Sequence, residues 1–467
     1  MSARDQLLEH RPSILVAGLG TTFGVGLMTV TDVLGQVVAS NDTLADSATV
    51  QGVLGVVAAV FVGLALYVGA IVTANTFATV VAGRTPTIAL LRLLGSSARD
   101  QRRAVAREGL VVGVAGAAAG TLLGFALVIV AVRVLVAQGR LPDLAYSYLS
   151  IGGLVPAVAV VLTTVAAAWI GSRRVLQVTP LQASDVAQDA PVTPGRRRTV
   201  RTVFAVLLVV GGGLLLIAGV VVGLVSVLGM LVAFVGGVLS FTGVVVGAHV
   251  VMPAVLGAVG RLFGTGQVAR LAAENAVRQP ERSTRATIGI VIGVTLVTTM
   301  SVALKTLSSF FTALADGDAA LAAALDSFFG TTLLILGALV GFSAVIAAVG
   351  MVNDMSLSVL QRRRELGLLR SIGSTAAQIR RMILLEATQM ASTAVVVGVV
   401  LGVVYGWAGA QSLLGSIEGG GGLIAPTVPV PLLVGLVLTT AVLAGVAALV
   451  PGRRATSVTP VEALVVR

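Results

Sequence analysis

The chain has 467 residues, of which 56% are hydrophobic and only 11% are charged. This charge is too sparse to cover the surface of a water-soluble protein, so the composition excludes that class. The absence of cysteine excludes disulfides, thiolate metal sites and thiol nucleophiles.

Apolar runs long enough to cross a bilayer recur along the whole chain. About 20 apolar residues span the hydrocarbon core as a helix, and we predict ten such helices. The fold class is therefore an all-α polytopic membrane protein. In chain order, the predicted spans cover approximately 13–36, 51–81, 107–137, 150–172, 203–225, 228–256, 285–306, 330–354, 386–409 and 431–451.

The basic residues fall on one side of this topology. With the N-terminus inside and strict alternation, all of the 31 lysines and arginines except Arg133, Arg140 and Lys305 lie in cytoplasmic segments or at their helix edges. Because basic loops cross a membrane poorly, both termini are predicted to be cytoplasmic in a multi-pass protein of the cell membrane. The net charge of +11 is thus a topology signal, and nucleic acid is not an expected partner.

One stretch occurs twice, 278 residues apart. IALLRLLGSSARDQRRAVARE (88–108) aligns without a gap with LGLLRSIGSTAAQIRRMILLE (366–386), and nine of 21 positions are identical. The halves also end alike, with GSRRVLQVTPLQA (171–183) and PGRRATSVTPVEA (451–463). Internal repeats are typical of transporters. We predict two parallel four-helix repeats joined by a two-helix hairpin.

These repeats divide the chain into three predicted segments. The first repeat covers 1–183, a cytoplasmic linker and the hairpin cover 184–260, and the second repeat covers 261–467. The entry segments match only loosely, with HRPSILVAGLG (10–20) against RQPERSTRATIG (278–289).

The repeated stretch contains a helix end followed by a helix start. Gly373 suits the left-handed position that ends a helix, and Thr375 followed by Gln378 is typical of a capping box that starts the next one. The pattern predicts a short amphipathic helix at the cytoplasmic face in 355–385, and an equivalent one in 82–106.

Two roles are open for these helices. Ser97 followed by Asp100 is a weaker capping signal in the first repeat, so the arrangement recurs in both halves. A basic helix of this kind could anchor to the membrane surface. Its recurrence with matching residues favours docking of a cytoplasmic partner.

RRRELGLLRSIGSTAAQIRRMILLEA (362–387) and the tail RRATSVTPVEAL (453–464) resemble the signature of the FtsX-like permease family, the MacB and LolC type of ABC transporter subunit. The resemblance implies a separate cytoplasmic ATPase dimer, which holds ATP and Mg²⁺ and receives one coupling helix from each repeat. The coupling residues that it implies here are Arg84, Arg92, Gly95, Arg362, Arg363, Arg364, Glu365, Arg370 and Gly373.

ATP hydrolysis is not expected in this chain itself. A phosphate-binding loop needs GxxxxGK[ST], and the single lysine, Lys305, lies at the outer end of a span. No cofactor is therefore assigned to the chain, which is not an enzyme by itself. Thr87 stands where the second repeat has Glu365, so the two coupling helices are expected to act unequally.

The predicted outer loops 37–50 and 307–329 are too short for the large extracytoplasmic domain that many family members carry. We therefore expect a ten-span permease that exports or extracts a hydrophobic, amphipathic or lipid-like substrate. The alternatives are a regulatory membrane protein that transmits nucleotide state without cargo, or an ion-coupled secondary transporter. The substrate, the identity of the ATPase and the number of permease copies stay open.

Three charged side chains are predicted within spans. Intramembrane charges are costly and often functional, so Asp32, deep in the first span, is a candidate for a functional or paired role. Arg133 and Lys305 lie near outer span ends, where snorkelling to the headgroups explains them. The repeat makes the first and seventh spans equivalent, so a contact between Asp32 and Lys305 is conceivable.

Two glutamates recur at the cytoplasmic edge of the repeats. Glu108 and Glu386 occupy the same position in both halves, and we expect them to pair with Arg92 and Arg370. His249 lies in an apolar run, where a packing role is expected.

Overall fold

The computed structural model is all-helical over the part of the chain that it describes, which confirms the predicted fold class. The described residues are 11–40, 55–57, 59–60, 63–64, 66–67, 70–71, 97–149, 151–171, 195–263, 271, 274, 280–314, 329–330, 363–417 and 422–457. The long elements are α2 (Arg11–Ala39), α6 (Ala98–Ala137), α7 (Ile151–Gly171), α8 (Gly195–Gly223), α9 (Gly229–Gly260), α11 (Pro280–Leu314), α13 (Arg363–Ser371), α14 (Ala376–Leu414) and α15 (Val430–Ser457), with the short 3₁₀ helix η4 (Arg261–Phe263) after α9.

Seven helices among the described residues are long and apolar enough to cross a membrane. They lie in α2, α6, α7, α8, α9, α11 and α14, where the sequence predicts the first, third to seventh and ninth spans. The predicted tenth span falls in α15, which contains a shorter apolar stretch at Leu433–Val446. The second and eighth predicted spans lie largely outside the described residues, so the count of ten stays a prediction.

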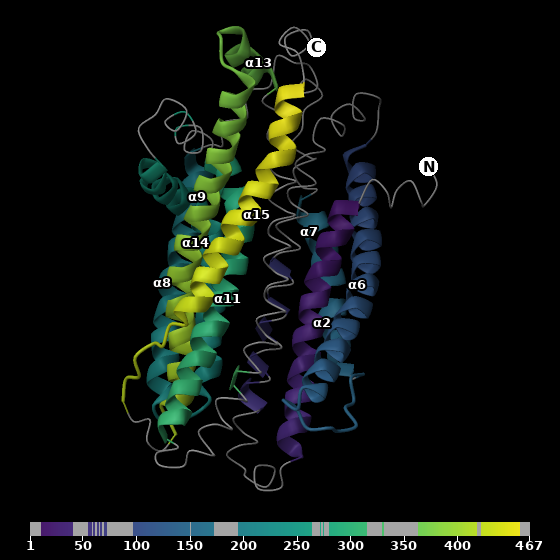
Figure 1. The fold of residues 1–467 in the computed structure, drawn as a ribbon, viewed down its shortest axis with the longest axis vertical. Helices are drawn as coiled ribbons and strands as arrows, with labels where there is room; N and C mark the ends of the chain where they lie inside the picture. The colour runs from purple at the N-terminus through teal and green to yellow at the C-terminus, as the bar shows by residue number, and fades with distance from the viewer. Residues whose placement is uncertain are drawn as a thin grey trace.

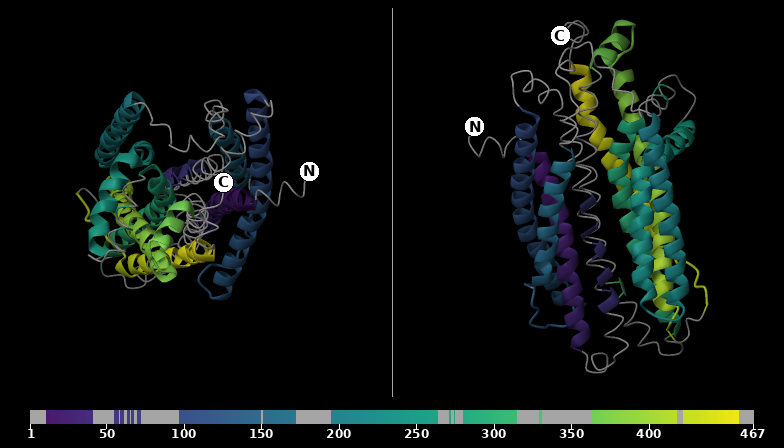
Figure 2. Two further views of the ribbon diagram at one scale, coloured as in Figure 1. Left: turned by 90° about the horizontal axis from the view of Figure 1, so that it is seen from above. Right: turned by 180° about the vertical axis from the view of Figure 1, so that it is seen from behind.

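The two halves contain the same three-helix bundle. In the first, α2, α6 and α7 pack together, and in the second α11, α14 and α15 do so. α6 begins at Ala98 and α14 at Ala376, which is the 278-residue shift of the sequence repeat. Figures 1 and 2 show the bundles side by side, with the start of α2, α13 and the end of α15 at one end of the molecule.

The first helix of each bundle, α2 or α11, is called here the entry helix. Its register is set by close contacts with glycines of the next helix in the bundle. A Cβ at Gly124 of α6 would meet the Thr22 carbonyl oxygen at 3.1 Å, and a Cβ at Gly402 of α14 would meet the Thr295 carbonyl oxygen at 2.9 Å. Small residues allow such close approach of membrane helices. Gly124 and Gly402 are equivalent in the repeat, so Thr22 is equivalent to Thr295, 273 residues later.

The glycine contacts define the register of the entry segments, which the sequence matches only loosely, and give a shift of 273 residues. With the structural register, Asp32 of α2 and Lys305 of α11 occupy equivalent positions, and both are half-buried.

The hairpin of α8 and α9 breaks the symmetry between the halves. A turn at residues 224–228 joins the two helices, as predicted, and the hairpin packs against α14 and α11 of the second bundle. Gln389 Nε2 of α14 donates to the carbonyl oxygen of Leu256 in α9 at 2.7 Å. The position equivalent to the buried Gln389 is Val111 on α6, which is exposed.

Each half also docks an extended segment onto its entry helix. In the first half, Gln36 Nε2 donates to the Ser147 carbonyl oxygen at 3.0 Å, and Ser147 N donates to Gln36 Oε1 at 2.8 Å. In the second half, Thr427 N donates to Thr306 Oγ1 at 3.1 Å. The entry helices α2 and α11 are the most deeply buried of the seven candidate spans, so both bundles are built around them.

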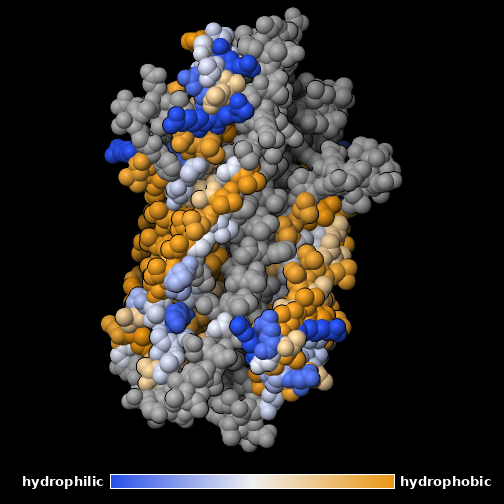
Figure 3. Space-filling model, in the orientation of Figure 1, coloured by the Kyte–Doolittle hydropathy of each residue, from blue (hydrophilic) through white to orange (hydrophobic). Residues whose placement is uncertain are grey.

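On the face shown in Figure 3, the described residues carry apolar side chains along the middle and hydrophilic side chains towards the ends. Exposed leucines and valines are frequent on α6, α8 and α15. This distribution matches a protein whose lateral surface faces lipid.

Candidate functional site

The turn between α13 and α14 has the backbone geometry that the sequence predicts. Gly373 has φ +106°, Gly373 N donates to the Arg370 carbonyl oxygen at 3.1 Å, and Ser374 N donates to the Leu369 carbonyl oxygen at 3.0 Å. These two bonds form the Schellman arrangement, which satisfies carbonyl groups at a helix end. Gly373 therefore ends α13.

The next helix starts with the predicted capping box. Gln378 N donates to Thr375 Oγ1 at 3.2 Å, and Thr375 N donates to Gln378 Oε1 at 2.8 Å. In the first repeat, Asp100 N donates to Ser97 Oγ at 3.1 Å, so Ser97 caps α6 at the equivalent place. Both long helices thus begin at a side-chain cap.

Helix α13 folds back onto the start of α14. Leu366 of α13 is buried with Ile379, Met382 and Ile383 of α14 in a small apolar cluster that is separate from the main core. With the capped turn, this cluster fixes the angle between the helices. Figure 1 shows α13 at the extreme end of the molecule, beyond the other described helices.

The outer surface of this turn combines apolar and charged side chains. Ile372 is 79% exposed and Leu368 is 46% exposed, while Glu365 is exposed and Arg370 is half-buried. We call these four residues the α13 tip. Exposed apolar side chains rimmed by charge mark protein interaction surfaces.

Leu368 and Ile372 are absent from the residues that the resemblance implies. A signal for them exists in the sequence, because the first repeat has Leu90 and Leu94 at the equivalent positions. Large aliphatic side chains therefore occur at both positions in each repeat, which is consistent with a shared contact.

The remaining coupling residues are only partly described. Arg84, Arg92, Gly95 and Arg362 lie outside the described residues, while Arg363 and Arg364 fall in the first turn of α13. Their proposed coupling role stays a prediction.

The structure places the predicted polar residues at different depths. Arg133 is exposed on α6, Glu108 is half-buried and Glu386 is buried. The pairings expected for the glutamates and for Asp32 stay predictions. His249 is buried in α9, with Nδ1 3.0 Å from the Val246 carbonyl oxygen, as expected of a packing histidine.

Replacing Gly373 by alanine is expected to destabilise the α13 turn by about 1–2 kcal/mol, because a Cβ is strained at positive φ. Hydrogen exchange of the amides of residues 372–375 should accelerate accordingly. Gly435→Ala, in α15 where a Cβ meets nothing within 4 Å, is the matched control. Equal exchange in the Gly373→Ala variant and the wild type would contradict a strained turn.

The described helices define a multi-pass membrane protein with a duplicated three-helix bundle and a capped turn between α13 and α14. The family profile for the FtsX-like permease C-terminal region matches this chain twice, at residues 59–180 and 337–460. The chain belongs to the FtsX-like permease family.

Individual relatives match over shorter stretches. An uncharacterized ABC transporter permease, YknZ of Bacillus subtilis, is 31% identical over 130 residues, which is 28% of this chain and 30% of that protein. The macrolide export ATP-binding/permease protein MacB of Nitrobacter winogradskyi is 32% identical over 131 residues, which is 28% of this chain and 19% of that protein. The ABC transporter permease YtrF of Bacillus subtilis is 32% identical over 59 residues, 13% of this chain and 14% of that protein. The matched stretches therefore span less than a third of each relative.

Proposed function

We propose that this chain is the membrane subunit of an ABC transporter. It couples ATP hydrolysis by a separate cytoplasmic ATPase dimer to the export or extraction of a hydrophobic, amphipathic or lipid-like substrate. Family membership supports the permease role, and the relatives named above include ABC transporter permeases. ATP and Mg²⁺ bind in the partner.

The observation that carries the proposal is the α13 tip. It presents Leu368 and Ile372 to solvent on a turn that is fixed by a cap and a small apolar cluster. A rigid, partly apolar knob suits a groove on a partner protein, whereas a membrane-surface anchor would lay a continuous apolar face on the lipid. The sequence repeat predicts a second such element in 82–106, so that one chain would serve both subunits of an ATPase dimer.

Motion of the α13 tip has a direct path into the membrane. α13 is joined to α14 by the fixed turn, and α14 packs against α11, α15 and the hairpin. A shift of the tip therefore moves α14 against the second bundle. Rocking of the two bundles against each other would open and close a substrate path between the repeats.

The test is capture of the ATPase. The chain is tagged, extracted gently from its native membranes and compared with the double variant Glu365→Arg, Arg370→Glu, which keeps the net charge. An ATPase should be captured with the wild type. The amount captured with the double variant should be at least about tenfold lower, equivalent to about 1.4 kcal/mol of binding free energy. Arg261→Glu, an exposed charge reversal in η4, is the control that should retain it.

Three results separate the candidate functions. If no ATPase accompanies the wild type in several detergents, the proposal loses its energy source and an ion-coupled secondary transporter is favoured. If an ATPase is captured but its activity ignores every hydrophobic compound tried, the regulatory role is favoured. Stimulation by one class of compound would support transport and identify the substrate class.

A further inference from the structure

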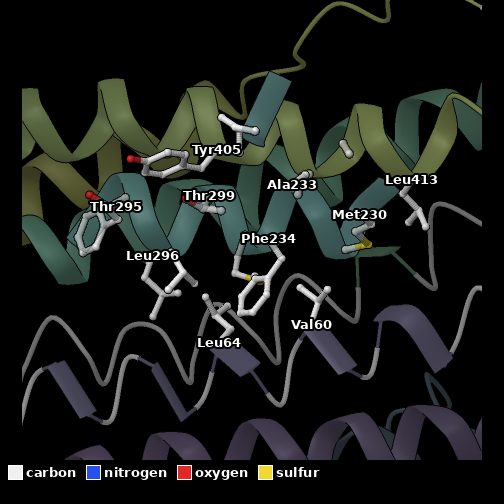
Figure 4. Close-up of a pocket in the computed structure, with 18 of the residues that line it drawn as sticks. Val60, Leu64, Met230, Ala233, Phe234, Thr295, Leu296, Thr299, Tyr405 and Leu413 are labelled. Atoms are coloured by element: carbon white, nitrogen blue, oxygen red, sulfur yellow. The ribbon is translucent and has the colours of Figure 1, made fainter. Parts of the chain in front are cut away.

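A cavity of about 180 Å³ lies between α8, α9, α11, α14 and the described residues of the predicted second span (Figure 4). Its walls are almost entirely aliphatic and aromatic. They include Leu64 of the predicted second span, Phe234 of α9, Leu296 of α11 and Leu413 of α14. The cavity therefore joins the first repeat, the hairpin and the second repeat.

An apolar space of this size accepts hydrocarbon better than water. An engineered cavity of about 150 Å³ lined by Leu, Ile and Phe stays dry and binds benzene. The cavity here is slightly larger and similarly lined. Gly409 of α14 forms part of the wall, and a Cβ built on it meets nothing within 4 Å, so the wall is open at that point.

The polar groups around the cavity offer little hydrogen bonding to a ligand. Thr295 lines the cavity, but its Oγ1 is buried. The nearby tyrosine hydroxyls are satisfied, since Tyr67 lies 2.9 Å from Thr242 Oγ1 and Tyr405 donates to Ser240 Oγ at 3.1 Å. The accessible wall is therefore apolar, which favours a hydrocarbon chain over a polar ligand.

We propose that this cavity binds the hydrocarbon chain of an amphipathic molecule. Bilayer phospholipids and single-chain amphipathic molecules share this chemistry. Binding of a resident lipid is independent of the function proposed above, whereas assignment of the occupant as transported cargo rests on that function. The hairpin of α8 and α9 occurs only once in the chain. The described residues of the first repeat therefore form no equivalent of this site.

The test uses palmitic acid that carries a photoreactive diazirine on its chain. The purified full chain in lipid nanodiscs is irradiated, and the labelled peptides are identified by mass spectrometry. Label is expected in the cavity-lining parts of α9, α11 and α14. Gly409→Leu, which fills the cavity, should lower this labelling about tenfold, equal to about 1.4 kcal/mol.

Gly213→Leu is the matched control, because Gly213 also lies on a helix with nothing within 4 Å but does not line the cavity. Its labelling should equal that of the wild type. Even labelling of the lipid-facing helices, or equal labelling of Gly409→Leu and the wild type, would overturn the proposal. Neither the probe nor the readout needs ATP or an ATPase, so this failure is distinct from failure of ATPase capture.

The same preparation distinguishes the two possible sources of the bound hydrocarbon chain. A phospholipid that stays bound in native mass spectrometry of the wild type and is lost from Gly409→Leu identifies a resident lipid. Competition by unlabelled palmitic acid, without competition by phosphatidylglycerol, identifies a single-chain ligand. Both results support the hydrocarbon site and differ only in its occupant.

Discussion

Replacing Ile372 by aspartate is expected to abolish capture of the partner ATPase while leaving the membrane helices folded. Ile372 is 79% exposed at the α13 tip, and its amide bonds the Leu368 carbonyl oxygen at 3.1 Å through the backbone alone. The substitution therefore leaves the turn intact and places a charge where an apolar contact is proposed. Burying an unpaired carboxylate in an interface costs several kcal/mol, so we expect at least about a hundredfold loss, close to 3 kcal/mol.

Two controls isolate the contact. Ile372→Leu keeps an apolar side chain and should retain the ATPase. Leu262→Asp places the same charge at a leucine in η4 that is 83% exposed, and it should also retain the ATPase because it lies outside the α13 tip. Normal capture by Ile372→Asp would show that the tip makes no contact with the partner.

Replacing Gly402 by leucine is expected to prevent stable packing of the second bundle. A Cβ at this position would lie 2.9 Å from both the Thr295 carbonyl oxygen and Thr298 Cγ2, with Thr298 Cβ closer still. Since the neighbouring atoms include backbone, α14 must move away from α11. Overpacking of this kind costs about 3 kcal/mol or more, and the temperature at which half of the protein stays monodisperse in detergent should fall sharply.

The matched control lies on the same helix. Gly409→Leu adds the same side chain seven residues later, where a Cβ meets nothing within 4 Å. Its thermal stability should equal or exceed that of the wild type, because leucine favours a helix over glycine by up to about 1 kcal/mol. Similar losses in both variants would mean that α14 does not cross α11 as closely as the structure shows.

Features that depend on neighbouring residues were predictable from the sequence. Gly373, Thr375 and Gln378 adopt the predicted helix end and capping box, because these motifs close hydrogen bonds within a few residues. Membrane helices follow the apolar runs for a similar reason, since each helix satisfies its own backbone.

Features that depend on helix contacts were not predictable. The crossing of α2 and α6 is set by where Gly124 meets Thr22, and no local pattern reports that register. The fold-back of α13 needs Leu366 to meet Ile379 across the turn. The cavity arises from five separate segments, so its lining residues share no motif in the sequence.

The length of α14 gives the α13 tip a mechanical advantage. Its 39 residues extend for about 58 Å at 1.5 Å per residue, roughly twice the ~30 Å hydrocarbon core of a bilayer. If α14 pivots where Gly402 touches α11, Thr375 lies ~40 Å from the pivot and Gly409 only ~10 Å beyond it. A tilt of about 10° then moves the tip by ~7 Å and the cavity wall by ~2 Å in the opposite direction. A large, weak displacement outside the membrane is thus converted into a short, forceful one inside it.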